Sequence, residues 1–285
     1  SWNNRRIQEH KLRGHYMEKM NASMWQYTPN NSPHPLPKSS FIISNQEILS
    51  LNLPQMTEHE MAIDSIKEAV ANAMVGQEKL SEHLTNNTAP SMADRKPLLL
   101  LGELANPFQL ARLGLGIIPV VTVRIRDLCR TYADSLDSRL IQPGIHHITM
   151  ARSKGWWELT HLSFVTVQQM KSMIQWLGNG ASTDWRPVKP NEGEIMLEFD
   201  PELRHPTMES MSSQGNIEIC NDVEPDQNGP KFDINQVIVP VHTRYGCYDS
   251  RGKIIRNYHI GQRDFHSNYF RKGSSMKWQD ILTTL

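Results

Sequence analysis

Residues 97–140 read PLLLLGELANPFQLARLGLGIIPVVTVRIRDLCRTYADSLDSRL. Apolar runs and helix-capping residues alternate along this stretch. They predict a strand at 98–101, a helix at 107–113, a strand at 117–125 and a helix at 127–140. Asn106 and Pro107 suit the N-cap and first turn of the first helix, and Asp127 suits the N-cap of the second. The order favours a mixed core of α/β or α+β class, with central helices and short buried strands.

Helices are also expected on both sides of this stretch. Three capping boxes predict their starts: Ser44 with Glu47, Thr57 with Glu60, and Thr166 with Gln169. The first predicts a short helix to about residue 51, and the third a helix to residue 177 that Gly178 terminates. The second predicts a longer helix that could reach residue 84, because residues 63, 66, 70 and 74 place apolar side chains on one face.

Irregular structure is expected near both ends. The prolines of residues 28–38 predict an extended arm without helix. Residues 200–230 are rich in Pro, Gly, Ser, Asn and acids, which is typical of a surface loop or partly ordered insertion. Residues 237–241 and 253–260 have strand composition, and a turn near 249–252 would join them as a C-terminal β-hairpin.

The expected organisation follows from these elements. It consists of an extended arm or linker at 1–40, a mixed α/β core at 41–190, an acidic loop or insertion at 191–235, and a basic-aromatic β region packed on the core at 236–285. At 285 residues the chain exceeds the usual size of one domain. One large domain with appendages and two domains are both open.

Charge is segregated in the C-terminal third. The whole chain balances 30 Lys and Arg against 30 Asp and Glu. Between residues 192 and 233, however, eleven acids face two bases, whereas between residues 244 and 277 eight bases face two acids. Any electrostatic role is therefore expected to be local.

The basic block is interleaved with aromatic residues, a mixture typical of surfaces that bind single-stranded nucleic acid. Trp156 and Trp157 are adjacent on an expected strand, so one of them would be exposed or covered by a neighbouring element. The candidate binding residues for nucleic acid or a partner are Arg244, Tyr245, Tyr248, Arg251, Lys253, Arg256, Arg263, Tyr269, Arg271, Lys272, Trp156 and Trp157. Two alternatives stay open: strand alternation that only buries the aromatic rings, and self-association between the acidic and basic blocks.

No complete catalytic or metal-binding motif is present, so no catalytic residue, metal ligand or cofactor is assigned. Residues 222–233 place acids and an amide in an EF-hand-like register, but position six is Gln227 and Pro225 interrupts the loop. His146 and His147 are adjacent and would point to opposite strand faces. His161, His242, His259 and His266 would need to converge in space to bind a metal.

These features favour a non-enzymatic component of a larger assembly that binds a partner protein, nucleic acid or a second copy through its C-terminal surface. The alternative is a metal-dependent hydrolase, for example a nuclease, that uses Glu194, Glu198 and Asp200 with a histidine. Three widely spaced cysteines and the absence of a recognisable signal peptide favour a cytoplasmic location. No stretch is apolar enough to predict a transmembrane span.

Overall fold

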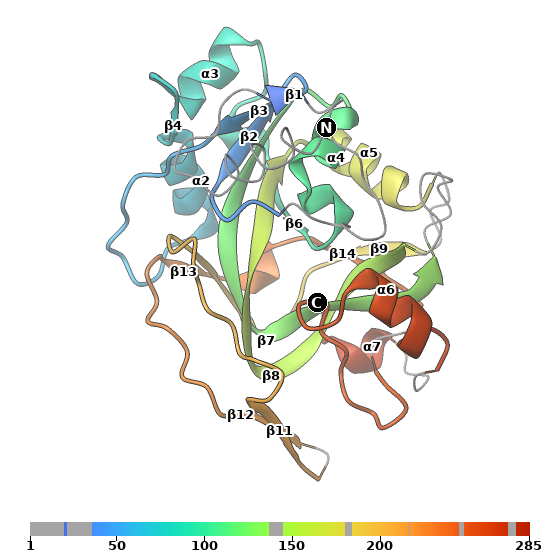
Figure 1. The fold of residues 1–285 in the computed structure, drawn as a ribbon. Coiled ribbons are helices and arrows are strands. Elements are labelled where there is room, and N and C mark those ends of the chain that lie inside the picture. Colours follow the sequence, from blue (N-terminus) through green and yellow to red (C-terminus); the bar gives the residue numbers. More distant parts are fainter. Residues whose placement is uncertain are drawn as a thin grey trace.

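The computed structural model describes residues 20–21, 36–136, 145–179, 184–215, 217–244, 248–272 and 278–285. Within them the fold is α+β, with a mainly antiparallel sheet (Figure 1). Eight described strands form the main sheet in the order β1-β3-β2-β7-β10-β13, while β8 pairs with β7 and β6 pairs with β8. Their bounds are β1 Met20–Asn21, β2 Phe41–Ser44, β3 Glu47–Ser50, β6 Lys96–Leu100, β7 Ile117–Leu136, β8 His146–Val165, β10 Glu194–Leu197 and β13 Lys231–Phe232.

Smaller elements surround this sheet. The short strand pairs are β4 Met74–Val75 with β5 Glu78–Lys79, β9 Trp185–Val188 with β14 Val239–His242, and β11 Met211–Gln214 with β12 Ile217–Cys220. The helices are α2 Ile63–Ala71, α3 Leu80–Asn86, α4 Pro107–Arg112, α5 Val167–Leu177, α6 Gln262–Asp264 and α7 Trp278–Ile281. Short 3₁₀ turns lie at η2 Met92–Asp94, η3 Glu103–Ala105 and η4 Ile234–Gln236, and a π turn, η5, lies at Phe265–Tyr269.

β7 and β8 form a long antiparallel hairpin in the main sheet, with 20 residues in each strand. Its register shifts between Arg126 and Leu128. At this bulge Asp127 has a φ of 63°, and its carboxylate accepts a hydrogen bond from the Gly155 backbone N–H at 2.8 Å. Because a bulge bends a strand pair and increases its twist, both strands curve away from the rest of the sheet (Figure 1).

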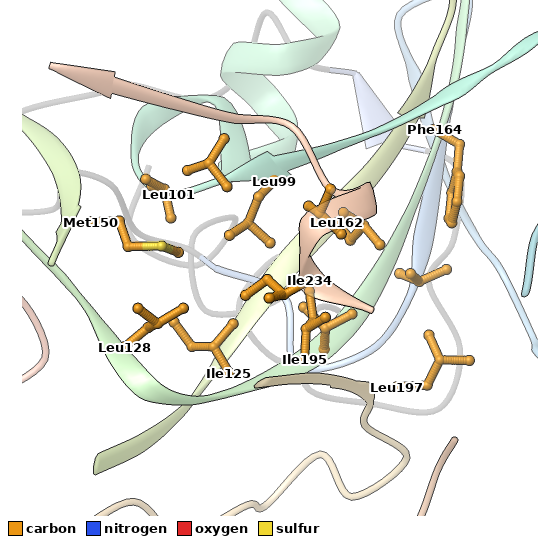
Figure 2. Close-up of a cluster of buried hydrophobic side chains, with 14 of the residues drawn as sticks. Leu99, Leu101, Ile125, Leu128, Met150, Leu162, Phe164, Ile195, Leu197 and Ile234 are labelled. Carbon is orange, nitrogen blue, oxygen red and sulfur yellow. The ribbon is translucent and has the colours of Figure 1, made fainter. Parts of the chain in front are cut away.

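Strands of the main sheet such as β6 and β7 are buried on both faces. On one face the core includes apolar residues of β6, β7, β8 and β10, with Ile234 of η4 beside them (Figure 2). Ile66 and Val70 of α2 and Leu84 of α3 belong to the same cluster. On the other face, residues of β2, β6 and β7 pack with α4 and α5. Burial on both faces explains the near-continuous apolar runs of these strands.

Several predicted elements are confirmed. β6 includes residues 98–100 of the expected strand at 98–101, and β7 includes the expected strand at 117–125. The Asn106 side chain accepts hydrogen bonds from the Phe108 and Gln109 backbone N–H groups, so it caps α4 as expected. The Thr166–Gln169 capping box forms at the start of α5.

The helix predicted at 127–140 is wrong as far as the chain is described, because β7 continues to Leu136. Asp127 suggested a helix N-cap, but its carboxylate binds the Gly155 N–H across the bulge instead. The residues that follow pair with β8, as Cys129 does with Ala151. Tertiary pairing with a partner strand therefore overrides the local capping signal.

The two N-terminal helix predictions also need correction. Ser44 and Glu47 face each other across a tight β2–β3 turn, in which Asn45 and Gln46 have φ angles of 50° and 73°. These are the positive φ values that a two-residue hairpin turn requires. The long helix expected from Thr57 begins only at Ile63 and ends at Ala71, where the β4–β5 turn separates α2 from α3.

The C-terminal hairpin prediction is wrong. β14 pairs with β9, and residues 253–260 form only isolated bridges, Tyr248 with Ile254 and Thr131 with Arg256. The expected turn at 249–252 does form, since the Asp249 N–H donates to the Lys253 carbonyl at 2.8 Å. The expected loop at 200–230 contains the β11–β12 hairpin. Most of the predicted arm lies outside the described residues.

Candidate partner-binding surface

The cations of the C-terminal segment, residues 244–272, are mostly on the surface. Those with exposed side chains are Arg244, Arg251, Lys253, Arg263, Arg271 and Lys272. Within the described part of the chain, five of them form no salt bridge, namely Arg244, Arg251, Lys253, Arg271 and Lys272. These five are called the free cations below. Tyr245, which was also a candidate, lies outside the described residues.

Arg256 differs from its neighbours because it is buried. Its Nη2 lies 2.5 Å from Glu218 Oε2 of β12, and its Nε donates to Ser153 Oγ at 3.0 Å. The guanidinium also lies 5.0 Å from the centre of the Trp156 ring, which is within cation–π range. Arg256 therefore ties the C-terminal segment to β8 and β12, and is not available to a partner.

The aromatic rings of this segment point mainly inward. Phe265 is fully buried and stacks on Tyr132, with 4.2 Å between ring centroids. Tyr248 and Tyr269 are half-buried and pack against the main core. Tyr258 is more open, with 44% of its surface exposed. The cations of this segment therefore face solvent while most of its aromatic rings contact the core. Ordinary packing produces this arrangement without any binding function.

Trp156 and Trp157 are both buried, so neither offers an exposed ring. The Trp156 Nε1–H donates to Glu158 Oε2 at 3.1 Å, and the Trp157 Nε1–H donates to the Arg204 carbonyl at 2.7 Å. Loop residues after β10 supply the cover over Trp157. The two indoles belong to the core of the hairpin rather than to its surface.

Six of the eleven acids in the acidic block, residues 192–233, form ion pairs within the described part of the chain. The ion pairs are Glu192–Arg152, Glu194–Arg126, Glu194–Lys231, Glu198–Arg124, Glu202–Lys38, Glu218–Arg256, Glu224–Arg124 and Glu224–Arg126. All but one of these cations lie outside the C-terminal segment. These ion pairs therefore engage six of the seven glutamates of the block, in each case with cations other than the free cations.

The strongest part of this network lies on β7 and β10. Arg124 and Glu198 are fully buried, and Arg124 Nε donates to Glu198 Oε2 at 2.7 Å. Burial raises the pKa of Glu194, but hydrogen bonds from Arg126 and Lys231 outweigh it, so the pKa lies below its ordinary value. Burial likewise opposes the charge on Arg126, yet its contacts with Glu224 and Glu194 raise its pKa.

Two of the three carboxylates proposed for metal-dependent hydrolysis bind these cations, and the third accepts a backbone hydrogen bond. Glu194 and Glu198 bind arginines, and Asp200 Oδ1 accepts a hydrogen bond from the Glu202 N–H at 2.9 Å. In the EF-hand-like stretch, Glu224 contacts two arginines. No group of three potential metal-binding side chains forms within the described residues. The hydrolase alternative stays a prediction that none of these contacts favours.

The histidines form separate pairs rather than one cluster. His146 and His266 approach at 2.9 Å, and His147 stacks on His242 with 5.4 Å between ring centroids. His146 and His147 thus contact different neighbours, as expected for adjacent strand residues. His161 lies apart, with its Nε2 at 2.6 Å from the Pro37 carbonyl oxygen. The four histidines considered for a metal do not converge.

Sequence reasoning missed the arginines that neutralise the acidic block. Arg124 and Arg126 stand two residues apart within the β-branched strand β7, so their side chains share one face. Two cations on a face that is otherwise apolar were the available signal for buried acidic partners. The partners themselves are 68 to 100 residues away in the chain.

Helices long and apolar enough to cross a bilayer do not occur among the described residues. In the comparisons with known proteins, no family model, no curated protein and no solved structure matches this chain.

Proposed function

We propose that this chain is a non-enzymatic component of a larger assembly and that its free cations hold an acidic surface of a partner protein. The proposal rests on one observation, the imbalance between the paired glutamates and the unpaired surface cations of the C-terminal third. Most glutamates of the acidic block already bind arginine or lysine, whereas the free cations have no acidic partner. Uncompensated surface cations select acidic partners and accelerate their association.

A protein is favoured over nucleic acid as the partner. Single-stranded nucleic acid is bound by exposed aromatic faces together with cations, whereas the described rings of the C-terminal segment, apart from Tyr258, are buried or half-buried. Residues 205–230 contain five acids and no lysine or arginine, and such a surface would repel phosphate. The free cations are thus better suited to carboxylates on a protein surface.

Binding of a labelled Glu-rich peptide, followed by fluorescence anisotropy, tests this proposal. We expect wild-type binding to weaken steeply between about 50 and 300 mM NaCl, because exposed charges are screened. The fourfold variant R251Q/K253Q/R271Q/K272Q should bind at least about tenfold more weakly. The matched control K171Q/K189Q removes exposed lysines elsewhere and should bind as wild type does.

Two results would overturn the proposal. Equal binding by the fourfold variant and the control would show that the free cations are not the contact. Tighter binding of an oligonucleotide than of the peptide, lost in the same fourfold variant, would identify nucleic acid as the partner class instead.

A further inference from the structure

The β11–β12 hairpin projects from the molecule beyond the bend of β7 and β8 (Figure 1). Within the described residues, its two strands pair only with each other. One face lies on the body: Met211 is buried, Glu218 binds Arg256, and Cys220 packs beside Trp156. The other face carries Ile217 and Ile219. An isolated two-stranded hairpin with open edges is a ready site for strand or side-chain docking.

Exposed apolar side chains are concentrated on this hairpin and in the residues that flank it. Four large apolar side chains are exposed here: Met208 by 49%, Ile217 by 64%, Ile219 by 36% and Val223 by 80%. They are half of the exposed large hydrophobic residues in the described part of the chain. Clustered exposure of this kind marks interaction surfaces, because covering each side chain would remove its apolar area from water.

The same surface is acidic. Glu209, Asp222 and Asp226 lie beside the apolar residues and form no salt bridge in the described structure. Asp222 accepts a hydrogen bond from the Thr207 N–H at 3.3 Å and faces Arg204, whereas residues 205–230 contribute no lysine or arginine. We call the exposed and half-exposed side chains of Met208, Glu209, Ile217, Ile219, Asp222, Val223 and Asp226 the hairpin surface. Its chemistry fits an occupant that is cationic and partly apolar.

We propose that this occupant is the C-terminal segment of a second copy of the chain, in a head-to-tail contact. This inference rests on the proposed function, since it names a second copy as the acidic partner of the free cations. The C-terminal segment has the required chemistry: five free cations together with the exposed ring of Tyr258. Because the chain has 30 cations and 30 acids, an assembly of copies accumulates no formal net charge that would oppose their association.

Head-to-tail contact uses two different surfaces, so a dimer leaves the C-terminal segment of one copy and the hairpin surface of the other free. Two variants separate them. I217K/V223K damages the hairpin surface, and R251E/K253E/R271E/K272E reverses the C-terminal segment. All six side chains are exposed or nearly so, and unchanged melting temperatures will confirm that the folds are intact. V167K, at a 42% exposed valine of α5, is the matched control.

Sedimentation velocity at increasing protein concentration provides the readout. We expect wild type and V167K to form larger species that dissociate with added salt, and each of the two damaged variants to associate at least about tenfold more weakly. Mixed together, the damaged variants should form a 1:1 dimer and nothing larger, because only one intact pair of surfaces remains.

Three outcomes would overturn the inference. A C-terminal variant that dimerises alone would show that the hairpin pairs with itself about a two-fold axis. Failure of the mixture to form a dimer would show that the two surfaces do not meet. A wild type that stays monomeric would exclude self-association, while salt-sensitive peptide binding by the free cations would leave the proposed function standing.

Discussion

Arg124 shows how single residues hold this fold together. Its side chain is fully buried, yet each guanidinium nitrogen has a partner: Nε binds Glu198, Nη1 binds Glu224 and the Pro225 carbonyl, and Nη2 binds the Asp226 carbonyl. Because every nitrogen of the guanidinium is hydrogen-bonded, these contacts offset the cost of removing its charge from water. One side chain of β7 therefore anchors the loop that follows the β11–β12 hairpin.

Buried histidines make stability depend on pH. Burial lowers the pKa of His161 from 6.5 to about 4, and the nearby charge of Arg130 acts in the same direction. Since the unfolded chain takes up this proton first, the contribution is complete above pH 6.5 and is lost as pH falls towards 4. We expect His161 alone to cost about 2 kcal/mol of unfolding free energy between pH 8 and pH 5.

Urea unfolding of wild type and H161Q at both pH values measures this cost. Glutamine can still donate to the Pro37 carbonyl but does not titrate, so the variant should lose about 2 kcal/mol less on acidification. The control H59Q replaces an exposed histidine and should follow wild type. A pH dependence identical in H161Q and wild type would contradict the assignment.

At the scale of elements, the bulge at Asp127 decides the shape of the β7–β8 hairpin. A positive φ is costly for most side chains but is tolerated by Asp and Asn. The same carboxylate satisfies the Gly155 N–H, and Gly155 itself has a φ of 81°. Two residues on facing strands thus supply the backbone freedom and the hydrogen bond that the bend requires.

Replacing Asp127 tests this role. We expect D127A to lower the unfolding free energy by about 1–3 kcal/mol, because it loses the hydrogen bond and places alanine at positive φ. D127N keeps both an acceptor oxygen and tolerance of this conformation, and should stay within about 0.5 kcal/mol of wild type. Guanidinium unfolding curves give both values; equal losses in the two variants would refute the explanation.

At the scale of the whole molecule, one core joins distant parts of the chain. A single cluster of buried apolar residues extends from Ile42 of β2 to Leu282 after α7, and includes residues from α2, β8, β14 and the C-terminal segment. Elements that share one core lose their packing together. The boundaries expected near residues 190 and 235 were predicted from composition alone. Because the segments on both sides of these boundaries share one core, we expect them to unfold together.

We therefore expect a single cooperative thermal transition. Calorimetric and van't Hoff enthalpies should agree, and fluorescence of the buried tryptophans should follow the same curve as far-ultraviolet circular dichroism. Two separated transitions, or a C-terminal segment that melts first, would show that the segment is energetically independent of the core.

Sequence signals predicted the structure correctly where the interactions join residues that are close together in the chain. Asn106 capped α4, the Thr166–Gln169 box formed, and Ile66 with Val70 face the core from α2, as their spacing predicted. The same kind of signal failed at Ser44, Thr57 and Asp127. At the first and last of these positions strand pairing supplied backbone hydrogen bonds that compete with a helix.

By itself, the sequence determined a mixed chain with two buried strands at 98–101 and 117–125, two capped helices, and charge segregated towards the C-terminus. Only the tertiary structure decided which charges are free. Ion pairs such as Glu198–Arg124 and Glu218–Arg256 join residues 74 and 38 positions apart. Spacing along a chain cannot reveal such pairs, because they depend on which strands and loops the fold brings together.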